Sequence, residues 1–246
     1  MQYFKKFLKV LMWPIIFFVG QFLIALVVGS IIHAIDSNIT PEEFIDKYSY
    51  VLAFITFIIF FIILAKKNKQ NNHLENKLKI KEMIYIFLIG ASMITIYNIV
   101  MSNINQIVLF TTFDTKNINI LEYIICTAIL GPILEELVFR GIVFNELKTF
   151  NKQMTSILIT SFLFAFFHST VLQVIYAFAL SFMLIYVYQK YKTIIAPILL
   201  HIVSNIFNLL SCMLITNNNQ IITYSVLVIS LITIFIINKK IIKKDL

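Results

Sequence analysis

Charged side chains are scarce in this chain of 246 residues. Asp, Glu, Lys and Arg make up 13% of it, whereas a soluble domain carries about 25%. Apolar residues make up 60%, and the mean hydropathy is +0.90. This composition excludes an ordinary soluble domain. We predict an all-α, polytopic membrane bundle of about eight transmembrane helices.

Cysteine is also rare, with two residues in the chain. Cys126 and Cys212 stand singly in apolar segments without the spacing of a metal site, so we expect both to be packing residues. No short repeat, Gly/Ser linker or low-complexity tail divides the sequence. We therefore predict one membrane domain over 1–246, with core helices in 118–213 and surrounding helices in 1–117 and 214–246.

Acidic residues are fewer than basic ones, 12 against 20, which leaves a net charge of +8. A basic chain can bind nucleic acid, but 18 of the 20 Lys and Arg residues lie in five segments. These segments are Met1–Lys9, Lys66–Lys81, Arg140–Lys152, Lys190–Lys192 and Lys239–Lys244. They are alternate loops of an eight-helix arrangement, which is the positive-inside pattern. We therefore place both termini in the cytosol and expect no nucleic-acid partner.

The N-terminus does not have the pattern of a cleaved signal peptide. Lys5, Lys6 and Lys9 precede an apolar run that continues to about Ile32 and is long enough to span a bilayer. The richness in Asn, Ile and Lys suggests an AT-rich bacterial genome. We expect a multi-pass protein of a bacterial cell membrane.

Apolar runs and the loops between them predict the helices. The expected ranges are about 10–33, 48–65, 83–102, 119–146 and 154–168, a sixth helix ending before Lys190, then about 193–215 and 221–238. Gly131 and Pro132 lie within the 119–146 range, where proline predicts a kink because it lacks the N–H of the helix ladder.

Three ionisable residues, Glu135, Glu136 and Arg140, stand inside an otherwise apolar run from Ile129 to Gly141. A charged side chain in mid-membrane costs about 2.5–3.5 kcal/mol on insertion scales, so these groups must face protein or trapped water. Glu136 and Arg140 are four residues apart on one helix face, which predicts an ion pair. Glu135 is about 100° around the helix from Glu136 and is free to face other helices.

Further polar residues on two other helices fall at a similar depth. His168 ends the 154–168 helix, and His201 and Asn205 share one face of the 193–215 helix. At about 1.5 Å per residue, these residues and Glu135 lie roughly 13–21 Å from the cytosolic edge. We expect Ser204 and Asn208 to be packing or hydrogen-bonding residues.

A carboxylate, two imidazoles and an amide around a buried water are the ingredients of hydrolysis. The carboxylate can act as general base, and a His or Asn can stabilise an oxyanion. Glu135, His168 and His201 could equally bind zinc with an open fourth position. No His-Glu-x-x-His helix is present. The sequence therefore does not determine the cofactor, and zinc is the candidate ion.

Three motifs, in order, resemble those of the CAAX protease and bacteriocin-processing family, also called Abi proteins. They are Glu135-Glu136-x-x-x-Arg140, Phe164-x-x-x-His168 and His201-x-x-x-Asn205, and they lie within about Leu130–Asn205. The resemblance implies an integral-membrane endopeptidase acting on a small peptide, a C-terminal tail or a lipidated protein within the bilayer.

The resemblance also implies roles for the motif residues. The candidate catalytic set is Glu135, Glu136, His168, His201 and Asn205. Within it, Glu135 with His168 would activate water, and His201 with Asn205 would stabilise the oxyanion. Glu136, together with Arg140 and Phe164, would give support or contact substrate. Both a metallopeptidase and a metal-independent, glutamate-dependent mechanism are compatible with these residues.

Two other classes of protein fit parts of this pattern. A non-catalytic bacteriocin self-immunity protein could sequester a peptide or its receptor, and this is the main alternative. A transporter or proton relay could also use buried Glu and His, but no inverted repeat or pair of broken helices supports it.

Overall fold

The computed structural model describes residues 2–35, 40–69, 76–104, 120–216 and 220–242. These residues form helices and turns and contain no strand, which confirms the all-α prediction. The chain divides into two compact units. The first comprises residues 1–76 and 115–194, and the second comprises 77–114 and 195–246. The expectation of a single domain stays a prediction.

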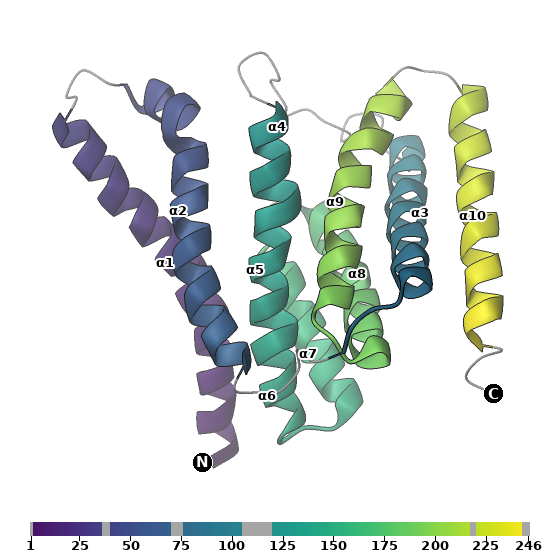
Figure 1. The fold of residues 1–246 in the computed structure, drawn as a ribbon, viewed down its shortest axis with the longest axis horizontal. Helices are drawn as coiled ribbons and strands as arrows, with labels where there is room; N and C mark the ends of the chain where they lie inside the picture. The colour runs from purple at the N-terminus through teal and green to yellow at the C-terminus, as the bar shows by residue number, and fades with distance from the viewer. Residues whose placement is uncertain (1, 36–39, 70–75, 105–119, 217–219, 243–246) are drawn as a thin grey trace. The chain divides into compact units, whose positions relative to one another are not determined.

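The first unit contains the long helices α1 (Gln2–Ile35), α2 (Pro41–Lys69) and α8 (Val171–Tyr191) and the shorter α7 (Gln153–Phe166). A continuous helical rod also belongs to it (Figure 1). The rod consists of α4 (Ile120–Tyr123), the π-helical η1 (Ile124–Leu130), α5 (Gly131–Val138), the π-helical η2 (Phe139–Phe144) and α6 (Asn145–Lys148). Both α1 and α2 pack against the rod, and α7 packs against η2 and α8.

Two π-helical segments interrupt the rod that carries the Glu-Glu-x-x-x-Arg motif. The first, η1, ends directly before Gly131 and Pro132. Because Pro132 has no N–H to donate to the preceding turn, the ladder must adjust there, and a wider π turn is one such adjustment. The second, η2, begins at Phe139 and contains Arg140. Single π turns are often found at functional sites, and these two flank both glutamates.

Two helices are longer than the sequence predicts. The first begins at Gln2 rather than near residue 10, and α2 continues to Lys69 rather than ending near residue 65. Both extensions run through lysines. Lysine is a good helix former, and it can keep its charged end in water while its stem lies along apolar surface. As a result, Asn68 belongs to α2 and not to the expected cytosolic loop.

Small side chains let α7 and α8 approach closely. The two helices are antiparallel, and Gln153 donates a hydrogen bond to Gln189 at 3.3 Å. Further from that pair, α7 carries Ser161 and Ala165, and α8 carries Ala177 and Ser181. All four are buried. Each helix thus carries two small residues four positions apart, a spacing that favours close packing of membrane helices.

The second unit contains α3 (Ile80–Ile104), α9 (Ile195–Thr216) and α10 (Gln220–Ile242). The first of these contacts both α9 and α10 (Figure 1). A Cβ added to Gly90 on α3 would lie 3.1 Å from the Leu200 carbonyl oxygen, so glycine permits the close approach of α9. Further along, the Asn98 amide donates to Asn208 Oδ1 at 2.8 Å, which confirms a hydrogen-bonding role for Asn208.

Four helices of the described chain are long and apolar enough to cross a membrane: Gln2–Ile35, Tyr50–Lys69, Ile80–Met101 and Val171–Tyr191. Shorter apolar helices cover Gln153–Phe166, Ile195–Leu210 and Tyr224–Ile236. These findings confirm a multi-pass membrane protein, and the cytosolic placement of both termini stays a prediction. Cys126 is a free cysteine with a partly exposed side chain, and the side chain of Cys212 lies outside the described residues.

Candidate active site

Glu136 and Arg140 form the ion pair that their spacing predicts. Arg140 Nη1 donates to Glu136 Oε1 at 2.9 Å, and the exposed fraction of both side chains is 0%. The four-residue spacing brings the two charges to one face of the rod. Because neither charge reaches water, each depends on the other and on nearby polar groups for its stability.

Arg140 also connects the rod to α7 and α8. Its Nη2 donates to Ser181 Oγ on α8 at 2.8 Å. Its guanidinium carbon lies 4.5 Å from the ring centre of Phe164 on α7, which is a cation–π arrangement. One buried cation therefore contacts both helices of the α7–α8 pair. This arrangement fits the support role that the sequence suggested for Arg140 and Phe164.

The Asn68 side chain of α2 packs against the rod at Gly141. The buried Asn68 side chain of α2 donates from Nδ2 to the carbonyl oxygens of Leu64, at 2.8 Å, and Leu137, at 3.1 Å. A Cβ at Gly141 would overlap Asn68 Oδ1 and lie 2.6 Å from its Cγ. The absence of a side chain at Gly141 thus makes room for an amide that joins the two helices.

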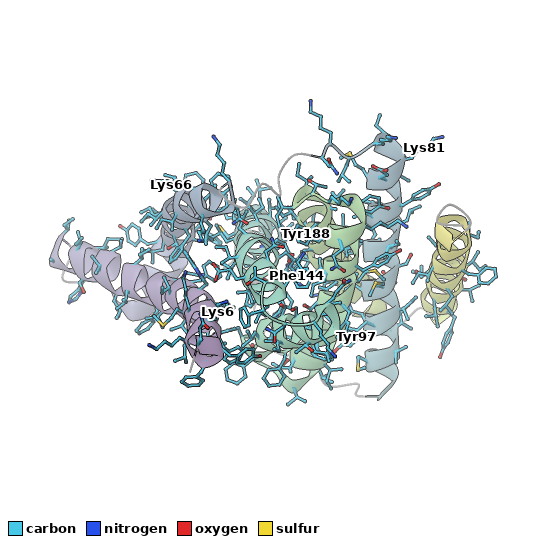
Figure 2. All side chains as sticks on the ribbon, turned by 90° about the horizontal axis from the view of Figure 1, so that it is seen from below. Lys6, Lys66, Lys81, Tyr97, Phe144 and Tyr188 are labelled. Atoms are coloured by element: carbon cyan, nitrogen blue, oxygen red, sulfur yellow. The ribbon has the colours of Figure 1, made fainter. Side chains whose placement is uncertain are left out.

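A second amide, Asn145, satisfies carbonyl groups of the π-helical segment. Its Nδ2 lies 3.0 Å from the carbonyl oxygens of both Arg140 and Gly141, and 2.6 Å from the Tyr188 hydroxyl on α8. The Phe144 ring meets the Tyr188 ring edge-on, with centroids 6.2 Å apart. Figure 2 labels both rings, in the interior of the first unit. These contacts fix the wider turn that carries Arg140.

Glu135 and His168 line one partly open cavity of about 200 Å³ in the first unit. The other lining residues are Phe18, Phe139, Phe164, Phe167, Ser169 and Gln173. The rod contributes Glu135, and the turn between α7 and α8 contributes His168. The expectation that His168 ends a 154–168 helix was wrong, because α7 ends at Phe166. The structure therefore brings together these two members of the predicted cluster. Glu136 is not among the lining residues and is turned to Arg140 instead.

The backbone contact of His168 indicates which ring nitrogen carries a proton. Nδ1 of His168 lies 3.0 Å from the Phe164 carbonyl oxygen. A carbonyl oxygen can only accept a hydrogen bond, so Nδ1 is the donor. In the neutral ring, Nε2 then has the lone pair and can accept a proton or a hydrogen bond.

The wall of the cavity beyond His168 is held by a capping box at the start of α8. The Gln173 backbone N–H donates to Thr170 Oγ1 at 3.2 Å, and the Thr170 N–H donates to Gln173 Oε1 at 3.3 Å. Ser169 Oγ donates to the same oxygen at 2.9 Å. These reciprocal bonds satisfy N–H groups that a helix start otherwise leaves without a partner.

His201 and Asn205, the other two residues of the predicted cluster, lie on α9 in the second unit. His201 is buried, with an exposed fraction of 3%, and Asn205 is half-buried. Ser204, between them, is fully buried, and its Oγ has no hydrogen-bond partner among the residues described. The convergence of His201 and Asn205 with Glu135 stays a prediction.

Several residues of the site were not identified from the sequence. They are Phe18 on α1, Asn68 on α2, Asn145 at the end of the rod, and Gln173 and Ser181 on α8. Gly141 was a partial signal for Asn68, because a glycine inside a helix often marks a close approach. The Thr170-x-x-Gln173 pattern was a signal for the capping box. Nothing local distinguished Phe18 from the other phenylalanines of α1.

Comparisons with known proteins give a family model and two similar proteins. The family model for type II CAAX prenyl endopeptidase Rce1-like proteins matches residues 117–207. The membrane-embedded CAAX protease MroQ of Staphylococcus aureus is 30% identical over 220 residues, which cover 80% of this chain and 86% of MroQ. YdiL of Bacillus subtilis, which is named as a membrane peptidase, is 34% identical over 84 residues, 34% of each chain. No solved structure gives a significant match.

The helices and their apolar character define a multi-pass membrane protein. The match to MroQ over most of both chains, together with the family model, shows to which family of membrane proteins this chain belongs. The chain belongs to the Rce1-like family of CAAX proteases, which are membrane endopeptidases.

Proposed function

We propose that this protein is a membrane endopeptidase that hydrolyses a peptide bond with a water molecule held by Glu135 and His168. The observation that carries the proposal is the shared, partly open cavity, which is lined by both a carboxylate and an imidazole. The substrate would be a small peptide or a C-terminal tail that enters from the cytosolic side of the membrane.

The two side chains offer complementary acceptors for one water molecule. The Glu135 carboxylate can take one O–H, and the Nε2 lone pair of His168, left by its contact to the Phe164 carbonyl, can take the other. A water held by both hydrogens presents its oxygen lone pairs to an incoming carbonyl carbon. The phenylalanine rings that line the cavity lower the local polarity, which strengthens these polar contacts.

The atoms of the reaction balance without a further reactant. The water oxygen bonds to the peptide carbonyl carbon while Glu135 takes one water proton. The C–N bond of the resulting tetrahedral intermediate breaks, and the proton passes from Glu135 to the leaving nitrogen. The products are a carboxylic acid and an amine. General-base assistance of this kind contributes typically about 10²–10⁴-fold to the rate.

The oxyanion of the intermediate needs hydrogen-bond donors, and we assign these to His201 and Asn205. The assignment rests on the resemblance of the His201-x-x-x-Asn205 motif, and both residues lie in the second unit. Glu136 is assigned to the support of Arg140, because the two side chains are paired and fully buried. Arg140 in turn holds α8, whose first turn lines the cavity.

A metal ion is not assigned a step in this reaction. Glu135 and His168 are donors that zinc accepts, but a zinc site needs at least three protein ligands. Among the residues described, no three His, Cys, Asp or Glu side chains form such a cluster. The third candidate, His201, belongs to the second unit.

The experiment that tests the proposal is cleavage of a defined library of short peptides by the purified protein in detergent, read by mass spectrometry. Glu135→Gln keeps the size and polarity of the side chain but removes the base, and His168→Gln removes the imidazole. We expect each to lower the cleavage rate by at least about 100-fold. Glu122→Gln, which changes an acidic residue of the same rod outside the cavity lining, is the matched control.

Cleavage at the wild-type rate by both cavity variants would show that the catalytic assignment is wrong. The same variants separate proteolysis from self-immunity in cells challenged with a bacteriocin. Protection that depends on Glu135 would support hydrolysis, whereas protection that persists in Glu135→Gln cells would indicate a binding role.

A further inference from the structure

Four of the residues that line the cavity are phenylalanines: Phe18, Phe139, Phe164 and Phe167. The rings of Phe18 and Phe167 are stacked, with centroids 4.1 Å apart and planes 12° apart. Phe139 meets Phe164 edge-on at 5.2 Å and contacts Phe167 at 6.3 Å. The same cavity contains Glu135. Glu135 and His168 therefore share the cavity with the four phenylalanine rings, which together we call the enclosure. One peptide residue can reach both the polar pair and the enclosure.

Phe18 differs from the other three phenylalanines in the part of the chain to which it belongs. It belongs to α1, whereas the remaining lining residues fall between Glu135 and Gln173. The family model matches residues 117–207 and does not include α1. Phe18 therefore reaches the cavity from a segment that the matched family region does not define. At about 1.5 Å per residue, it is roughly 14 Å along the helix from Lys9, a depth similar to that expected for Glu135.

The size of the cavity limits what it can hold. A cavity of about 150 Å³ lined by Leu, Ile and Phe binds benzene. The cavity here, at about 200 Å³, can thus hold one aromatic or branched aliphatic side chain. An acidic side chain would lose its hydration against the phenylalanine rings and would meet the carboxylate of Glu135.

We propose that this enclosure is the subsite for one apolar side chain of the substrate peptide, next to the bond that is cut, and that Phe18 sets the size it accepts. The inference rests on the proposed hydrolysis by Glu135 and His168. Phe18 closes the subsite by its stack on Phe167. Removing the Phe18 ring extends the space, and a larger ring at the same position fills it.

The experiment uses a peptide that the wild-type protein cleaves and a series of its variants that differ only at the residue beside the cut, with Ala, Leu, Phe or Trp. The quantity measured is the ratio of kcat/KM values between two peptides, because such a ratio does not depend on the fraction of active protein. In an apolar pocket, a change of about one methylene alters such ratios roughly 10–200-fold. We expect Phe18→Ala to raise the Trp-to-Leu ratio by at least about 10-fold, and Phe18→Trp to lower the Phe-to-Ala ratio.

The matched control is Phe22→Ala. Phe22 lies one turn further along α1 and is 62% exposed, so its removal leaves the cavity unchanged. Its ratios should equal those of the wild type. Phe18→Leu and Phe167→Leu keep an apolar side chain at each half of the stack. Both should shift the Trp-to-Leu ratio in the same direction as Phe18→Ala, by a smaller factor, even if Phe18→Ala folds poorly.

Unchanged ratios in the Phe18 and Phe167 variants, with cleavage still dependent on Glu135, would overturn the subsite and leave the proposed hydrolysis standing. An equal shift in Phe22→Ala would also overturn it, because the effect would then come from α1 in general. Cleavage that does not depend on Glu135 would instead remove the proposed function on which the subsite rests.

Discussion

The guanidinium of Arg140 lies 2.9 Å from the carboxylate of Glu136, and neither side chain is exposed. Two charges in such a place are stable only together, because each without the other would be an isolated charge in an apolar interior. The pair also carries the contacts from the rod to Phe164 and Ser181. Arg140 therefore contacts the helices that surround the cavity, whereas Glu135 lines the cavity itself.

We predict that Arg140→Ala lowers the free energy of unfolding by about 3–5 kcal/mol, because it leaves Glu136 buried without its cation. Glu135→Ala should have a smaller effect, since Glu135 is only half-buried. Thermal unfolding of the detergent-solubilised protein and its purified yield measure both. The double variant Glu136→Leu/Arg140→Met removes both charges and should recover part of the loss. Equal, normal yields of Arg140→Ala and Glu135→Ala would contradict this.

Gly141→Ala should destabilise the protein by about 1–3 kcal/mol, because the new methyl group displaces the Asn68 amide from its two carbonyl acceptors. Asn68→Ala removes the obstacle and should make the same glycine change tolerable. The two substitutions will therefore not add, and a double-mutant cycle measured by thermal unfolding gives their coupling. Gly131→Ala is the control in the same rod, because its added Cβ would meet the Cys126 carbonyl oxygen at an ordinary 3.5 Å. If the effects of the two substitutions on stability simply add, Asn68 does not restrict which side chain fits at position 141.

Two buried serines on the α7–α8 pair should respond differently to the loss of a hydroxyl. Ser181→Ala removes an acceptor of Arg140, and a hydrogen bond to a charged group is worth about 1.5–3 kcal/mol. Ser161 is equally buried, but its Oγ has no hydrogen-bond partner among the described residues. We expect Ser161→Ala to be neutral or slightly stabilising. Unfolding midpoints compare the two variants directly, and an equal loss in both would contradict the role of Ser181.

Thr170→Ala should lower stability by about 1 kcal/mol, because it removes the side-chain oxygen that caps α8. Peptide cleavage should fall as well, since Ser169 and Gln173 line the cavity and depend on the same turn. Thr170→Ser keeps the hydroxyl and should behave as the wild type in unfolding and in cleavage. A loss in Thr170→Ser as large as in Thr170→Ala would show that the hydroxyl is not the stabilising group.

The spacing of residues along a helix was sufficient to predict much of the candidate site. Successive residues of a helix are about 100° apart, so the separation of the two glutamates and the Glu136–Arg140 pair followed from position alone. The excess of apolar residues determined the helical membrane fold in the same way, because a bilayer allows few other spanning structures. The helix ends were less predictable. The lysines near the ends of these helices can also continue a helix, so α1 and α2 extended further than expected.

The sequence by itself therefore determined that this is a helical membrane protein with a paired Glu136 and Arg140 and a separate Glu135. Tertiary structure alone decided that Phe18 of α1 stacks on Phe167 and that Asn68 of α2 fills the space beside Gly141. The physical reason is that these contacts join segments more than 70 positions apart. The packing of whole helices determines these contacts, and no local sequence pattern at Phe18 or Asn68 predicts which residue it will contact.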